Sequence, residues 1–135
     1  MTAQKDVVKQ VIEHIESNLE KELDLEAIAQ AAGYSKFHLN RLFARETGCT
    51  IYKYLQARRL TVAAEKLVKT TLPIAQIAYD AGYNSQQAFT LAFKQLYVYP
   101  PKLYRERGIF QPKQQRISLC QCAWELAGLA ERQAA

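Results

Sequence analysis

The feature that most constrains the fold of this 135-residue chain is an internal repeat. The segment LEAIAQAAGYS at 25–35 recurs as IAQIAYDAGYN at 74–84, with identical residues at five positions. Beyond this segment the offset changes from 49 to 50 residues, which aligns Phe43 with Phe93. A short chain that carries the same unit twice is expected to form two small, similar subdomains.

Each copy of the repeat is predicted to be a short helix, a tight turn and a second helix. Gly33 and Gly82 mark the two turns, because glycine tolerates the left-handed backbone that ends helices, and the small alanines before them allow the helices to cross closely. This is the layout of a helix-turn-helix unit, whose second helix enters the DNA major groove. The alternative is a duplicated helical hairpin that serves only packing.

Apolar residues recur at helical spacing through most of the chain and predict about seven helices in the first 110 residues. The first is expected over residues 4–21, and the others are expected to begin at Asp24, Ser35, Thr50, Pro73, Asn84 or Ser85, and the Pro100–Pro101 pair. No alternation typical of strands is present in the sequence. The predicted fold class is therefore all-α, with two homeodomain-like helix-turn-helix subdomains joined by a long linker helix.

The linker helix is predicted from the absence of glycine and proline between Thr50 and Lys69, which allows about 19 residues of helix, roughly 28 Å. Its apolar residues form one group near the start and another, on a shifted face, near the end, so each end is expected to enter a different core. The predicted organisation is 1–49 for the first subdomain, 50–70 for the linker, 71–110 for the second subdomain and 111–135 for a tail of uncertain structure.

The charge of the chain is concentrated in its middle. The formal net charge is +5, but residues 1–35 hold 3 basic and 7 acidic side chains, whereas residues 36–69 hold 8 and 2. A positive segment that follows an acidic one is typical of a nucleic-acid contact surface. An ordinary solvated basic helix face is the alternative.

Three exposed positions of the third helix are candidates for reading bases. Arg41 can donate two hydrogen bonds to guanine and Asn40 can pair with adenine. Phe37 suits a contact with a thymine methyl or a sugar, although it can also be a second core residue. The corresponding candidates on the sixth helix are Gln86, Gln87, Thr90 and Leu91.

Basic and hydroxyl side chains around these positions are candidates for binding phosphates. The predicted set is Ser35, Lys36, Arg45, Lys53, Arg58, Ser85, Lys94, Lys102 and Arg105. For Arg58 or Arg59, a structural ion pair with an acid of the first helix is an equally open alternative.

The sequence argues against metal, redox and membrane functions. Cys49, Cys120 and Cys122 match neither a redox pair nor a zinc pattern, so no metal or cofactor is expected. No segment is long and apolar enough to span a membrane, and the acidic first helix is unlike a secretory signal. A cytoplasmic protein, associated with the nucleoid when bound, is expected. An enzyme using Cys49 with His38 or His14 has no supporting motif.

Three longer segments carry a family resemblance. They are GYSKFHLNRLF at 33–43, YLQARRLTVAAEKL at 54–67, and IAYDAGYNSQQAFTLAFKQ at 77–95, which PPKLYR follows at 100–105. Together they resemble the AraC/XylS family of bacterial transcription regulators, most closely its compact branch that includes MarA, SoxS and Rob. The resemblance implies two reading helices on one face, a monomer on asymmetric double-stranded DNA, and activation of stress or resistance genes through RNA polymerase.

The resemblance also assigns residues. Phe37, Asn40 and Arg41 occupy the base-contacting places where this branch usually has Trp, Gln and Arg. On the second reading helix, the matching places are Gln86, Gln87, Ala88, Thr90 and Leu91. Leu91 stands where the branch normally has arginine, so one hydrogen-bonding base contact is lost and the operator is expected to differ.

The tail and the missing sensor domain leave further alternatives. No ligand-sensing domain is expected before the first helix, and without such a domain the amount of protein would set its activity. The alternative is a sensing domain after the tail, which the resemblance implies for Rob-like members. A helical stripe in the tail comprises Leu119, Cys122, Ala123, Leu126 and Leu129, and it can dock on the body, mediate association or be a disordered appendage. A non-specific DNA-binding or protein-interaction module is the competing function.

Overall fold

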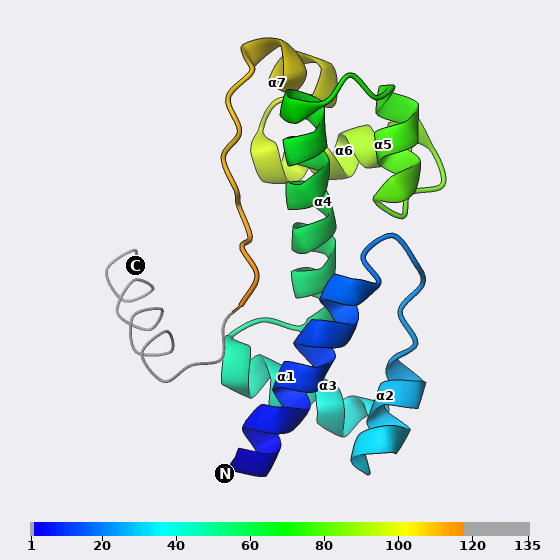
Figure 1. The fold of residues 1–135 in the computed structure, drawn as a ribbon, viewed down its shortest axis with the longest axis vertical. Helices are drawn as coiled ribbons and strands as arrows, with labels where there is room; N and C mark the ends of the chain where they lie inside the picture. Colours follow the sequence, from blue (N-terminus) through cyan, green and yellow to red (C-terminus); the bar gives the residue numbers. More distant parts are fainter. Residues whose placement is uncertain (1, 118–135) are drawn as a thin grey trace, which may run out of the picture.

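The computed structural model describes residues 2–117 of the chain, with seven α-helices and no strand in that part (Figure 1). The helices are α1 (Thr2–Ser17), α2 (Leu25–Ala32), α3 (Lys36–Thr47), α4 (Ile51–Lys69), α5 (Ile74–Asp80), α6 (Gln86–Tyr97) and α7 (Pro101–Arg107). The all-α prediction is confirmed. The helical stripe predicted beyond Ile117 lies outside the described residues.

The helix beginnings follow the local sequence closely. Asp24, Ser35 and Thr50 each accept a hydrogen bond from the backbone N–H three residues later, as N-capping residues do. Ser85, and not Asn84, opens α6 in the same way. Pro73 lies just before α5 rather than inside its first turn.

The largest difference from the predicted boundaries lies in the first helix. The first helix ends at Ser17 and does not extend to residue 21. Asn18 donates its side-chain amide to the carbonyl of His14 at 2.8 Å, and the next backbone N–H groups form tight turns instead of continuing the helix. Asparagine competes with the helical backbone in this way, so the chain turns towards α2 four residues earlier than the apolar spacing predicts.

The long helix α4 connects two separate cores, as its two apolar groups predict. In Figure 1, α1, α2 and α3 surround its lower end, and α5, α6 and α7 surround its upper end. Ile51, Tyr54 and Leu55 belong to the first core, which also contains Phe43 and the apolar face of α1. The second core comprises Leu60, Ala63, Ala64, Leu67, Ile77, Ala78, Ala81, Phe89, Phe93, Tyr97 and Tyr104.

After α7, the chain returns along α4 as an extended segment, residues 109–117 (orange in Figure 1). Phe110 packs against the second core and Ile117 against the first. Within residues 2–117, no helix has the length and apolar character needed to cross a membrane.

Candidate nucleic-acid interface

The two helix-turn-helix units, α2–α3 and α5–α6, have the same turn geometry. Tyr34 donates its N–H to the carbonyl of Ala29 at 2.8 Å, and Tyr83 donates to Ala78 at 3.1 Å. The glycine before each tyrosine has a positive φ, +79° at Gly33 and +88° at Gly82, which other residues rarely adopt. The aligned sequences therefore make the same turn.

A serine caps the beginning of the second helix of each unit. The Ser35 hydroxyl oxygen accepts from the N–H of His38 at 3.1 Å, and Ser85 accepts from Ala88 at 3.0 Å. Both serines are exposed, and a hydroxyl that accepts one hydrogen bond can still donate its hydrogen to a phosphate oxygen. The positive end of the helix dipole lies at the same place, which also favours an anion.

The outer face of α3 presents the predicted side chains, because Leu39, Leu42 and Phe43 occupy the buried face. Phe37 is 78% exposed, so it is not the core residue that the alternative required. Arg41 is exposed as well. Asn40 is half-buried, and its amide donates one of its two hydrogens to the carbonyl of Lys36 at 3.2 Å, which leaves the second hydrogen and the amide oxygen for another partner.

The outer face of α6 is polar but carries an exposed leucine. Gln86 and Gln87 are exposed at the start of the helix, and Thr90 is half-buried one turn later. Leu91 is 62% exposed. Phe89, Phe93 and Tyr97 take the buried face. The four predicted readers of α6 thus lie away from the core.

Most of the predicted phosphate-binding cations are exposed. They are Lys36, Arg45, Lys53, Lys94 and Lys102. Arg45 lies 3.9 Å from the carboxylate of its neighbour Glu46. The exposed lysines come from α3, α4, α6 and α7, and therefore from both halves of the molecule.

Arg58 requires a correction. Its guanidinium donates to both carboxylate oxygens of Glu16 in α1, at 2.8 Å each, and to the carbonyl of Gln114 at 2.8 Å. Burial alone would raise the pKa of Glu16, but the hydrogen bond and charge of Arg58 lower it below its ordinary value. Arg58 forms the structural ion pair that was the alternative and is not a phosphate ligand candidate.

Arg105 makes hydrogen bonds within the protein. Its guanidinium donates to the carbonyl of Leu67 at 2.9 Å, in the last turn of α4, and to the carbonyl of Leu72 at 2.6 Å, in the loop that follows the helix. The last carbonyls of a helix lack partners within the helix, and Arg105 supplies one for the carbonyl of Leu67. A phosphate contact of Arg105 would have to use the N–H groups that these carbonyls leave over.

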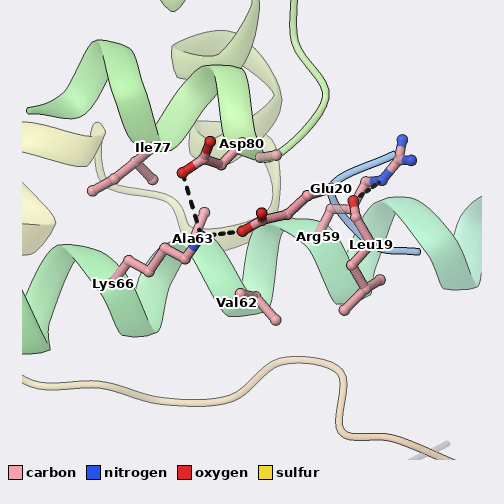
Figure 2. Close-up of a pocket in the computed structure, with 9 residues that line it drawn as sticks. Leu19, Glu20, Arg59, Val62, Ala63, Lys66, Ile77 and Asp80 are labelled. Atoms are coloured by element: carbon pink, nitrogen blue, oxygen red, sulfur yellow. Dashed lines mark hydrogen bonds and ion pairs between the residues drawn. The ribbon is translucent and has the colours of Figure 1, made fainter. Parts of the chain in front are cut away.

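Two further cations join the α1–α2 loop to the second half of the molecule (Figure 2). The ammonium nitrogen of Lys66 lies 2.7 Å from a carboxylate oxygen of Glu20 in the loop and 3.5 Å from a carboxylate oxygen of Asp80 in α5. Burial alone would lower the pKa of Lys66, but these carboxylates raise it. Arg59 donates to the loop carbonyl of Leu19 at 2.8 Å. Lys66 and Arg59 therefore bind groups of the protein itself.

A groove between the two helix-turn-helix units was not predicted from the sequence. It encloses about 560 Å³ and is lined by residues of the α1–α2 loop, the start of α4 and the α5–α6 turn. Tyr52 and Tyr79 line it and are 68% and 74% exposed. Helical periodicity does not find it, because the groove arises from the relative placement of the two units. Among residues 2–117, no cluster of three or more potential metal ligands occurs.

The comparisons with known proteins agree with this arrangement. Residues 10–107 match the family model described as a helix-turn-helix domain. The chain is 40% identical over 98 residues to the multiple antibiotic resistance protein MarA of Escherichia coli K12, which covers 73% of this chain and 77% of that protein.

Solved structures show the same fold. An AraC-type DNA-binding regulator from Chromobacterium violaceum has a TM-score of 0.71 at 26% identity, covering 80% of this chain and 96% of that one. The DNA-binding domain of the global transcriptional factor AdpA, solved with a target DNA, has a TM-score of 0.63 at 25% identity and covers 77% and 90%. The chain belongs to the AraC family of DNA-binding transcription regulators, which are not enzymes.

Proposed function

We propose that this regulator reads one asymmetric DNA site as a monomer, with α3 and α6 in adjacent segments of the major groove. The observation that carries the proposal is the duplicated arrangement of exposed polar side chains directly after a serine cap. In Figure 1, α2 and α5, which lead into the reading helices, lie on the same side of α4. This placement supports simultaneous contact with one face of the duplex.

The α3 helix is proposed to supply most of the base specificity. The exposed Arg41 can make a bidentate contact with guanine, the commonest specific contact in direct readout. Phe37 projects into solvent, where it can pack on a thymine methyl, and Asn40 can address adenine with the amide hydrogen and oxygen that the Lys36 carbonyl leaves over. Ser35, Lys36, Arg45 and Lys53 would hold the neighbouring phosphates.

The α6 helix is proposed to contribute less hydrogen-bonded specificity. Gln86, Gln87 and Thr90 can bond base edges, whereas Leu91 offers only an apolar contact. Ser85, Lys94 and Lys102 would bind phosphates beside it. We expect one half of the site to be more strictly defined than the other.

The regulatory output is proposed by likeness to MarA, whose name refers to multiple antibiotic resistance. On this proposal the protein acts in the cytoplasm and on the nucleoid, where it activates stress or resistance genes through contact with RNA polymerase. Transcription in a purified system, with and without the selected site, tests the activator role. Repression from that site, or no effect, would contradict it.

The binding proposal is tested by selecting bound sequences from a random duplex library at about 150 mM salt. The expected result is an asymmetric motif with two parts about one helical turn apart, bound at least about 1,000-fold more tightly than scrambled DNA. A motif with a single part would contradict reading by α6. No enrichment would favour a non-specific DNA-binding or protein-interaction module.

A further inference from the structure

One face of α4 carries three polar side chains that point towards the segment 109–117. Tyr54, Arg58 and Thr61 follow the spacing i, i+4 and i+7, which places them on one stripe of a helix. Tyr54 and Thr61 are 1% and 3% exposed. Buried hydroxyl groups need hydrogen-bond partners, and these two find partners in the segment that returns from α7.

This segment, which we name the strap (residues 109–117), is bound to α4 through its backbone. The N–H of Gln114 donates to the Thr61 hydroxyl at 3.1 Å, and the N–H of Ile117 donates to the Tyr54 hydroxyl at 3.2 Å. Arg58 donates to the carbonyl of Gln114 at 2.8 Å. The strap therefore has three hydrogen bonds to the middle and lower part of α4.

The strap also contacts both cores. Phe110 packs on the second core, beside Lys69, whose ammonium lies 5.5 Å from the ring centre. Ile117 packs on the first core. Arg58 extends this connection to α1, because the same guanidinium binds Glu16. A bend in the middle of α4 would change the distance between the cores and break these contacts.

We propose that the strap is a positioning element, which fixes the orientation of the two helix-turn-helix units so that both reading helices reach one DNA face. The proposal rests on the proposed two-helix reading of DNA, and concerns a segment beyond residues 10–107, which the family model covers. In Figure 1 the strap lies on the side of α4 opposite α2 and α5, so it can stay in place while DNA is bound.

The physical consequence concerns the spacing of the DNA site. Two reading helices on a rigid body bind DNA as one unit. The second helix adds affinity only when the distance between the two helices matches the spacing of the two parts of the site. A flexible connection lowers the affinity for the matched site and tolerates altered spacing. Binding to a single half-site does not depend on the connection.

The test uses the full chain with Ile117→Asp, which places a charge in the first core contact of the strap. Its matched control is Gln115→Asp, which adds the same charge at an exposed strap position. Affinities are measured for the selected site, for the same site with two extra base pairs between its parts, and for its α3 half-site. We expect Ile117→Asp to lower the affinity for the selected site about tenfold and to reduce the difference in affinity between the two spacings. Its affinity for the half-site should be unchanged. The control should behave as the parent protein.

A second readout needs no DNA. Residual dipolar couplings of the amides in α1–α3 and in α5–α7 report whether the two groups share one alignment. The parent and Gln115→Asp should fit a single alignment tensor, and Ile117→Asp should need two. Thr61→Val removes the acceptor for the Gln114 N–H with little change of shape. It is also expected to need two alignment tensors, and it replaces Ile117→Asp in the test if that variant does not fold.

Two results would overturn the proposal: a single tensor for the strap variants, or unchanged spacing discrimination. Failure of the parent protein to select any two-part site would overturn the proposed reading of DNA instead. In that case, the dipolar couplings would still decide whether the strap fixes the two units.

Discussion

At the scale of single residues, Arg41 is the side chain whose removal should change specificity most. Arg41→Ala is expected to cost about 1–3 kcal/mol on the selected site and to relax one base position, because a bidentate guanine contact is lost. Lys53→Ala is the comparison, since the loss of an exposed lysine proposed to bind phosphate should weaken binding to all sequences about equally and lower the salt slope by about 1. Competition binding at several salt concentrations measures both. Equal loss on every sequence from Arg41→Ala would refute direct readout.

Leu91 provides the complementary gain-of-contact experiment. Leu91→Arg should tighten binding to operators of the MarA type by about 1–3 kcal/mol, since it restores a hydrogen-bonding side chain on α6. Leu103→Arg adds the same charge at an exposed position of α7 and should raise affinity only weakly and for all sequences. Gel-shift titration compares the variants, and equal behaviour would mean that α6 does not reach base edges.

Single residues also show which features of the candidate interface could be predicted from the sequence. Exposure of Phe37, Arg41 and Leu91 followed from their helical positions relative to the buried stripe. For Arg58, an ion pair with an acid of the first helix was one of two open alternatives, but neither the choice of Glu16 nor the contact with Gln114 followed from the sequence. The carbonyls that Arg105 binds did not follow either, because they approach it only after folding. Composition and spacing report that an arginine is present, whereas its role depends on the tertiary acceptors within its reach.

At the scale of elements, the residue that ends α6 has a strained backbone conformation. Val98 follows the helix with a φ of +74°, a region in which a β-branched residue is unfavourable and glycine is not. Val98→Gly is therefore expected to stabilise the protein by about 0.5–1 kcal/mol. Val62→Gly, inside α4, should destabilise it, because glycine is unfavourable in a helix interior. Urea unfolding measures both, and a loss of stability from Val98→Gly would contradict the strain.

The elements themselves could be predicted to different degrees. Caps at Asp24, Ser35 and Thr50 are local signals, so the beginnings of α2, α3 and α4 were predicted correctly. The end of α1 was not, because the side chain of Asn18 competes with the helix. Residues 111–117 were expected only as a tail of uncertain structure. Their binding to α4 requires the buried hydroxyls of Tyr54 and Thr61, which no local pattern reveals.

At the scale of the whole molecule, Glu16 connects α1 with α4 and, through Arg58, with the strap. Its carboxylate binds Arg58 and accepts from the Tyr54 hydroxyl at 3.1 Å, and the ion pair is largely shielded from solvent. Glu16→Gln should therefore lower the free energy of unfolding at pH 7 by about 1–3 kcal/mol. The control Glu13→Gln, at an exposed position of the same helix, should have little effect.

The pH dependence of that difference tests its electrostatic origin. The pKa of Glu16 is lower in the folded protein than its ordinary value of 4.5, so its contribution is fully present above that value and is lost as the pH falls through the lowered pKa. The stability gap between the parent and Glu16→Gln should be constant from pH 7 to about pH 5 and should narrow below about pH 4. Urea titrations across this range measure the gap. A gap that stays constant down to pH 2 would show that the carboxylate charge does not hold α1, α4 and the strap together, and that shape and neutral hydrogen bonding suffice.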